Sequence, residues 1–585
     1  MTVENKKKKL VAMIFVFLSV FIIAGSWLFT DIELRFYDDQ IGTLLPPALL
    51  AGRDWSWVMK NIDYYGIGYY WIFFPVFLLT NNYKIIYFVI SLVNILGLSV
   101  LSLFIFSFVY KYIEKDRILL TAGFSIIATL LFTYNTTLYN EYPAFFLTWI
   151  IIFIIIKLYE SNNKFKSIVL SILLGLISAY STLVHERMLA LVLAIVICFT
   201  LLVFSKELKI SNYILFLASL AVFYFISREI KGDIIARLWD ENEINNTSVI
   251  NGVSPFSRGA ILGMCLCLCG NIYKFILGTY GVGLFSFIVF FDEIKKLGTK
   301  ILRRKKSEQD NIKTSSVKVV FLICCFAVGI TVFGLAYNQG YFINYSVENN
   351  IISQSFKSFF YQRYYILFLG PILLSTLVLF KDMKIKRKGY YAIILFLIIL
   401  IKIINVDILP LIEKTDYYVG DVNFSSVMFR IPLFSGENQV FNIILSIAIL
   451  LLFVSCINTK KYKLWVILSL IILLLNSNVA HIRIPAKFSN PYENSYNFVK
   501  SMEEETEISR IYCNYNYKTF QFVLNDYTVE AIDNIHDISD KDIFFSKEDF
   551  GEIKNMKLYQ LGEEEYVYIC NELDDSIDFT GKSIY

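Results

Sequence analysis

Long apolar runs alternate with short charged gaps along most of this chain. The clearest runs cover residues 10–29, 85–110 and 440–457. Each approaches or exceeds the roughly 20 residues that a helix needs to cross the hydrocarbon core of a bilayer. This pattern predicts an all-α polytopic membrane protein.

The charged gaps predict how the helices are oriented. Lys and Arg collect in cytoplasmic loops, so the gaps "NKKKK", "KYIEKDR", "KKLGTKILRRKK" and "KDMKIKRKG" are assigned to the inside. A count of about 13 transmembrane helices then places every basic gap on the cytoplasmic side, with the N-terminus cytoplasmic and the C-terminal tail extracytoplasmic. A single miscounted span would reverse the later half of the chain, so this agreement supports the count. We therefore expect a multi-pass protein of the plasma membrane.

Several boundaries follow from the same pattern. The seventh span is expected over 213–226, followed by an outer polar segment, and a single eighth span precedes "KKLGTKILRRKK". The ninth and tenth spans flank the outer segment "YNQGYFINYSVENNIISQSFKSFFYQRYY". Residues 64–80, "YYGIGYYWIFFPVFLLT", are apolar but short, and counting them as a span would break the charge pattern. We predict that they form an interfacial or partly re-entrant helix within the first outer loop, 30–84.

Composition agrees with this class and marks a second domain. Charged residues make up 18% of the chain, against about a quarter in soluble domains. Residues 484–585 differ, with 21 Asp and Glu against nine Lys and Arg. There "ISRIYCNY", "YTVEAI" and "EEYVYIC" predict strands, and "NPYENSYNFVKSM" predicts a helix. A transmembrane domain, 1–483, is thus expected to precede a small extracytoplasmic α/β domain, in which pairing of Cys513 with Cys570 stays open.

Polar side chains gather at the outer ends of the predicted spans. Ionisable groups at membrane depth are costly, and they usually face a protein interior or a water-filled pathway. Each group also has an ordinary interpretation, as a loop carboxylate, a helix cap, a polar turn or an interfacial anchor. The groups are Asp38 with Asp39, Glu141 in "YNEYP", the "HER" triplet of His185, Glu186 and Arg187, and Arg363 with Tyr364 in "YQRYY".

These residue types suit one kind of chemistry. A carboxylate can take a proton from an acceptor hydroxyl or hold a divalent cation through its oxygens. An arginine fork binds phosphate oxygens bidentately and can neutralise a phosphate leaving group. A carboxylate and an arginine, both at the headgroup interface, therefore fit transfer from a phosphate-linked lipid.

In this order the motifs resemble the GT-C superfamily of polyprenyl-phosphate-sugar-dependent glycosyltransferases, especially its protein mannosyltransferase and aminoarabinose transferase branch. "YDDQIGTLLPPALLAG" looks like the family's Asp-Glu segment, with Asp38 at the catalytic Asp and Asp39 in place of the usual Glu. "YNEYPAFFL" matches the second outer loop, with Glu141 where Asp is commoner. "QRYYILFLGPILL" is similar to the Arg-Tyr segment and carries Arg363.

The resemblance covers about residues 10–380 and has two departures. "YYGIGYYW", which contains Tyr65, resembles a short helix that normally reads His-Pro-Pro-Leu-Tyr, but the His-Pro-Pro is absent. Where relatives often place a Lys after span five, this chain has "HER". The substrate contacts made by these two segments are therefore expected to differ from those of the family.

The resemblance implies an inverting transfer of a sugar from a polyprenyl-phosphate donor to an acceptor on the extracytoplasmic face. Asp38 would be the general base or acceptor-positioning group, and Arg363 would hold the lipid phosphate. Glu141 and His185 would order the acceptor, a metal or the phosphate. The expected set is completed by Asp39 beside Asp38, and by Arg187, Tyr364 and Tyr65 in substrate binding.

The expected partners follow from the same chemistry. A divalent cation, Mg or Mn, is a candidate cofactor, with Asp38 and Glu141 as its candidate ligands. The acceptor is a glycan, a glycolipid or a protein, membrane lipids surround the helices, and no nucleic acid is expected.

Other functions remain alternatives. A polysaccharide polymerase or ligase would rely more on arginines in large outer loops than on an early carboxylate. A non-enzymatic lipid-glycan transporter commonly shows internal repeats and broken midplane helices, and this sequence shows no repeat. An assembly factor whose tail binds a partner is the third alternative.

Overall fold

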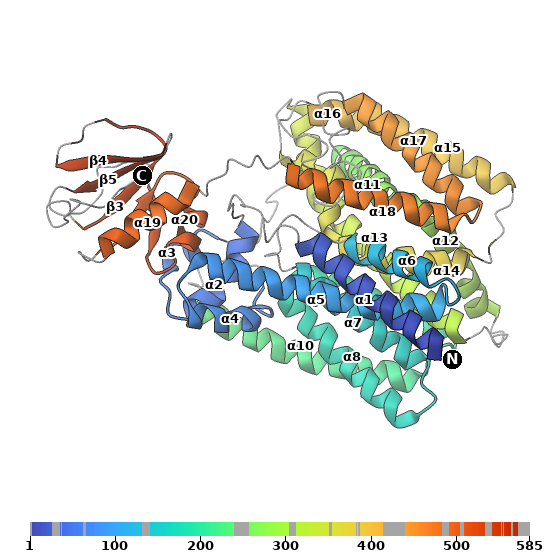
Figure 1. Cartoon of the computed structure of the whole chain (residues 1–585). Helices are drawn as coiled ribbons and strands as arrows, with labels where there is room; N and C mark the ends of the chain where they lie inside the picture. The colour runs from blue at the N-terminus through green and yellow to red at the C-terminus, as the bar shows by residue number, and fades with distance from the viewer. Residues whose placement is uncertain are drawn as a thin grey trace.

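The structure is a computed structural model of the whole chain (Figure 1). It describes residues 3–25, 36, 38–62, 66–131, 141–238, 257–303, 312–349, 354–381, 383, 387–413, 439–482, 491–503, 508–532, 541–551, 553, 555–562 and 565–570.

Nine helical stretches within this part of the chain are long and apolar enough to cross a membrane. They lie in α1 (Val3–Gly25), α5 (Tyr83–Tyr112), α7 (Glu141–Tyr159), α8 (Lys164–Val184), α9 (Leu189–Phe204), α10 (Ile210–Leu238), α11 (Arg258–Gly278), α13 (Ile312–Glu348) and α15 (Arg387–Ile403). The helical, membrane-embedded class is therefore confirmed, whereas the count of 13 spans stays a prediction.

Further helices pack in the same bundle. They are α6 (Ile118–Leu130), α12 (Val282–Arg303), α14 (Leu369–Phe380), α16 (Leu409–Glu413), α17 (Gln439–Asn458) and α18 (Tyr462–Ile482). A π-helical turn, η6 (Ile404–Ile408), joins α15 to α16. Their buried faces join those of α5 to α15 in one large apolar core.

The expected eighth span is a broken helix. α11 and α12 are separated at 279–281, where the backbone takes positive φ at two successive residues. Gly263 of α11 lies against Gly340 of α13, and Glu293 of α12 pairs with Lys318 of α13. The contact made by α11 thus lies later along α13 than the contact made by α12. Both α11 and α12 therefore run antiparallel to α13, one after the other. The two pieces together make one passage along the bundle.

Two helices continue beyond their expected ends. α10 runs through "SREIKGDIIARL" to Leu238, and α13 runs through "YNQGYFINYSVE" to Glu348. Both stretches were expected to be outer loop. Most of their polar residues tolerate helix well, so hydropathy indicates where a helix leaves apolar surroundings and not where its backbone ends.

The first outer loop folds into three short helices, α2 (Asp38–Leu50), α3 (Ser56–Lys60) and α4 (Tyr70–Leu79). The ten residues of α4 rise only about 15 Å, half the hydrocarbon thickness, which agrees with the predicted interfacial helix. The loop ends at α5, where the Asn82 side chain accepts from two backbone amides of the first turn.

Glycines bring the first outer loop against the last turn of α8. Gly66 has φ +108, and a Cβ there would lie 2.4 Å from the Val184 carbonyl oxygen. The amides of Ile67 and Gly68 donate to the Leu183 carbonyl oxygen at 3.1 and 3.0 Å. The carbonyl oxygens that α8 leaves unpaired at its end are thus partly satisfied by the loop.

The C-terminal part contains the predicted mixture of helix and strand. Its helices are α19 (Pro491–Glu503) and α20 (Tyr517–Val523), and its strands are β1 (Ile511–Cys513), β2 (Val529–Ala531), β3 (Ile543–Ser546), β4 (Met556–Gly562) and β5 (Glu565–Cys570). The strand order is β2-β1-β3-β5-β4. β1 is parallel to β2 and β3, and β5 is antiparallel to β3 and β4. Cys513 and Cys570 are separate free thiols.

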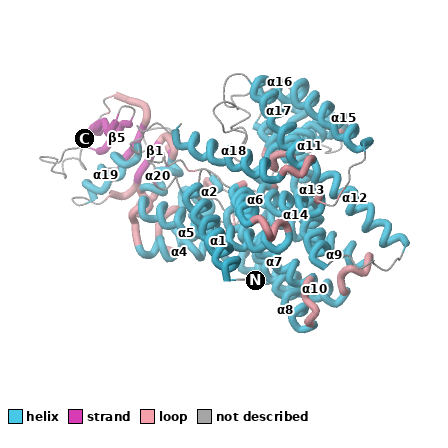
Figure 2. The backbone as a smooth tube through the Cα atoms, turned by 45° about the vertical axis from the view of Figure 1, so that its right-hand side comes forward, coloured by secondary structure: helices cyan, strands magenta, loops and turns pink. Residues whose placement is uncertain are grey.

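This small domain and the first outer loop share one hydrophobic core. Phe36 and Trp55 of the loop are buried together with Phe498 and Phe522 of the domain. Both lie at one end of the helical bundle, while the N-terminus lies toward the other end (Figure 1). All strands within the described residues belong to that domain (Figure 2). The count of 12 spans between loop and domain stays a prediction.

Candidate functional site

The "HER" triplet forms the break between α8 and α9. His185 is extended, with φ −154 and ψ 122, and its Nδ1 accepts from the Arg187 amide at 3.4 Å. That bond starts the short helix η2 (Glu186–Met188). The Arg187 guanidinium also lies near the His185 ring, with Nη1 at 3.4 Å from Nε2. The triplet is thus a structured turn whose imidazole and guanidinium face each other.

Arg187 reaches across to the predicted Arg-Tyr segment. Its Cζ lies 3.6 Å from the centroid of the Tyr364 ring, a close cation–π contact. Tyr364 ends η4 (Gln362–Tyr364), and the adjacent Arg363 is buried, with 8% of its surface exposed. Two sequence-predicted groups, separated by more than 170 residues, therefore meet.

A glycine face of α11 supports the segment that carries Arg363. That segment begins with η3 (Gln354–Phe360) and continues beyond η4 into η5 (Ile366–Phe368). A Cβ at Gly270 would lie 2.2 Å from the Phe359 carbonyl oxygen, and one at Gly278 would overlap the Gln362 side chain. Only glycine permits this close approach.

Lys274 lies on the same face of α11. It is four residues from both glycines, so its Cβ shares their side of the helix, and its side chain is fully buried. Charged side chains in membrane helices are rare and usually functional. Lys274 thus adds a second buried cation near the segment of Arg363.

An apolar cavity of about 460 Å³ lies between α11, α12, α13 and α14. Its lining includes Phe287, Phe326 and Phe333. Asn271 is a polar group of its wall, and its Nδ2 donates to the Ser358 carbonyl oxygen at 2.8 Å. The Tyr365 hydroxyl donates to the Asn271 carbonyl oxygen at 3.1 Å. The cavity therefore adjoins the segment that holds Arg363.

A second pocket, of about 600 Å³, lies between the end of α8, η2 and α10. It is lined by both acidic and basic side chains, including Glu186, Arg228, Glu229 and Lys231. Glu186 forms an ion pair with Lys231. The helical extension of α10 supplies most of this wall, so the sequence pattern did not predict the pocket.

Asp38 lies at the start of α2 and forms an ion pair with Lys518 of α20, 480 residues away. About half of the Asp38 side chain is exposed, against 23% for Lys518. Burial alone would lower the pKa of Lys518, but the hydrogen bond and the charge of Asp38 outweigh it, and the pKa is raised. The predicted catalytic carboxylate is therefore held by the C-terminal domain.

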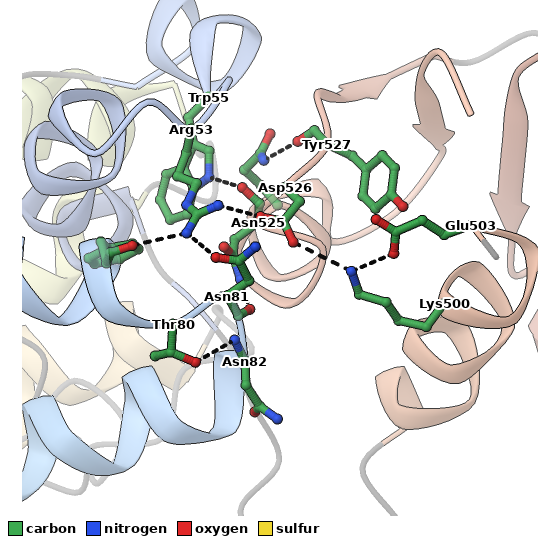
Figure 3. Close-up of polar contacts among 12 residues, drawn as sticks. Arg53, Trp55, Thr80, Asn81, Asn82, Lys500, Glu503, Asn525, Asp526 and Tyr527 are labelled. Carbon is green, nitrogen blue, oxygen red and sulfur yellow. Dashed lines mark hydrogen bonds and ion pairs between the residues drawn. The ribbon is translucent and has the colours of Figure 1, made fainter. Parts of the chain in front are cut away.

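The same interface contains a more buried ion pair (Figure 3). Arg53 Nη1 donates to Asp526 Oδ1 at 2.5 Å, while Nη2 donates to the Phe77 carbonyl oxygen at 2.9 Å and to the Asn81 side chain. Asn525 Nδ2 donates to the Asn81 backbone at 2.6 Å. Arg53 thus joins the domain to both halves of the first outer loop.

The side chains of three predicted site residues lie outside the described part of the structure. Tyr65 falls there entirely, and for Asp39 and Glu141 only the helical backbone is described. Among the described residues, no group of three or more His, Cys, Asp and Glu side chains could hold a metal ion. The Asp38 carboxylate is engaged by the ammonium of Lys518, and Mg or Mn as a cofactor stays a prediction.

Three residues of this arrangement were not predicted. A lone lysine within the apolar run "GNIYKFILG" was the available signal for Lys274. Lys518 and Arg53 had no comparable signal, because each gains importance only from a partner hundreds of residues away.

No family model matches this chain, and no curated protein or solved structure matches it.

Proposed function

We propose that this protein is a membrane glycosyltransferase of the GT-C type, moving a sugar from a polyprenyl-phosphate donor to an acceptor on the extracytoplasmic face. The contact of Arg187 with Tyr364 carries this proposal. It joins two sequence motifs that the resemblance assigns to one substrate site. The hydrogen bonds from Ile67 and Gly68 to the end of α8 bring the first outer loop beside them.

The donor lipid would use the apolar cavity and the cations beside it. A prenyl chain suits the phenylalanine-lined space between α11 and α13. Its phosphate would then face Arg363 and Lys274, which lie on the segment and the helix that meet at Asn271. Buried cations stabilise charge that develops on a leaving group, because little water screens them.

The reaction is an inverting substitution. The acceptor hydroxyl oxygen attacks the anomeric carbon, and the bond from that carbon to the phosphate oxygen breaks. Asp38 accepts the hydroxyl proton or orients the hydroxyl, and polyprenyl phosphate leaves with its negative charge balanced by Arg363 and Lys274. Asp39, Glu141, His185 and Tyr65 remain proposed substrate contacts, and the choice among sugars and acceptors stays open.

The test is transfer of label in membranes that contain the full chain. A radiolabelled polyprenyl-phosphate sugar should lose its label to a product that no longer extracts with the donor lipid. Asp38→Asn should abolish this transfer while the protein remains folded in the membrane. Arg363→Ala should mainly weaken use of the donor, seen as a higher donor concentration at half-maximal rate.

Glu348→Gln is a matched control, because Glu348 is an exposed acid at the end of α13. It should transfer at the wild-type rate. Full activity in Asp38→Asn would remove the assignment of Asp38. Label that crosses the membrane still attached to its donor lipid would favour the transporter instead.

A further inference from the structure

α20 is fixed against the first outer loop on both sides of Lys518. Tyr517 packs edge-on against Trp57, with ring centroids 5.1 Å apart. On the other side, Thr519 Oγ1 accepts from the Phe36 amide at 3.3 Å. Phe36 stands two residues before Asp38, so the two anchored neighbours set where Lys518 points.

The ammonium of Lys518 has two partners, an aromatic ring and a carboxylate. It lies 5.2 Å from the centroid of the Tyr517 ring and forms the ion pair with Asp38. An ordinary surface ion pair is weak, because it must hold two long, flexible side chains in one geometry. Lys518, with 23% of its side chain exposed, is more enclosed than such a lysine.

We propose that Lys518 is the resident cation of the Asp38 carboxylate and takes the place of a divalent metal ion there. Its role rests on the proposed function: the ammonium orients the carboxylate toward the acceptor hydroxyl. Lys518 is then a positioning residue that acts through Asp38, and the C-terminal domain completes the site by carrying it.

The first experiment asks whether metal binds at Asp38 and needs no enzymatic activity. Mn²⁺ is titrated into the purified full chain in lipid nanodiscs, and free Mn²⁺ is read by electron paramagnetic resonance. The wild type and Asp38→Asn should bind the same number of ions. A Mn²⁺ site that is present in the wild type and lost in Asp38→Asn would overturn the proposal.

The second experiment measures the role of Lys518 in transfer after dialysis against EDTA. The wild type should keep its rate without metal. Lys518→Gln should transfer about 10- to 100-fold more slowly, the range found when the partner that orients a metal ligand is removed. Lys518→Arg should restore most of the rate, because it keeps the positive charge.

Lys547→Gln is the matched control. Lys547 belongs to the same domain, is exposed, and lies 5.3 Å from the centroid of the Tyr515 ring. It should transfer like the wild type. Equal rates for Lys518→Gln and the wild type would overturn the proposal, as would a wild type that needs Mn²⁺. A wild type without any transfer overturns the proposed function, and the Mn²⁺ titration still decides the metal question.

Discussion

Arg53→Met tests whether docking of the C-terminal domain depends on one buried ion pair. The Arg53 and Asp526 side chains are 15% and 18% exposed, and the guanidinium also serves two acceptors in the first outer loop (Figure 3). Methionine keeps much of the apolar stem and removes the charge. The substitution therefore removes one cation from three acceptors at once.

The expected cost is worked from these contacts. Removing one partner of a buried pair costs about 3–5 kcal/mol, mainly because the other charge stays buried and unpaired. Asp526 would keep Lys500, whose Nζ lies 3.4 Å away, so the lower end applies. A loss of about 3 kcal/mol corresponds to about 150-fold in the docking equilibrium.

Hydrogen exchange of the full chain in nanodiscs measures this change. Amides of α3 and α20 should lose protection by up to that factor, while amides at the centre of α8 stay unchanged. Lys84→Gln is the control, since the Lys84–Glu493 pair joins the same loop and domain but has half-exposed side chains. Such pairs contribute about 0–1 kcal/mol. If Arg53→Met loosened α20 no more than Lys84→Gln does, the buried pair would not control docking.

Three further variants test the packing. Burial raises the pKa of Glu565 above its ordinary 4.5 and outweighs two hydroxyl donors that lower it. The wild type therefore loses stability as the pH rises from that ordinary pKa through the raised pKa of the folded state. Glu565→Gln should therefore unfold at a higher temperature than the wild type at pH 8, with the difference vanishing near pH 4. Gly68→Ala places a Cβ 2.8 Å from the Val184 amide nitrogen, so exchange at 66–72 should increase, with about 1–3 kcal/mol lost. Lys318→Met removes the buried partner of Glu293 and leaves it only the half-exposed Lys296, and the lower melting temperature of this variant should be partly recovered when Glu293→Gln is added.

Hydropathy and basic gaps predicted most of the helices, because a bilayer imposes length and composition on each span separately. These two signals did not predict helix breaks and helix ends that depend on tertiary contacts. The break at 279–281 occurs within an apolar stretch that looks like one span. The extension of α10 to Leu238 is polar, so composition alone resembles a loop.

The candidate site was predicted in its parts and not in its pairings. "HER" and "QRYY" stood out because charges beside apolar runs are costly, and the structure joins them through Arg187 and Tyr364. Nothing in either motif indicates the other as its partner. Asp38 was expected to face the same groups, yet its described ion pair is with Lys518, a residue without any local signal.

The pairings also change what the boundary at residue 484 means. Composition separates a transmembrane part from an acidic tail, but Phe36 and Trp55 bury their side chains against the tail and Asp38 takes its counter-charge from it. A chain cut at 484 would expose that apolar face and leave the carboxylate without its cation. The boundary in composition is therefore not a structural boundary, because the first outer loop and the C-terminal domain form one structural unit at the end of the bundle.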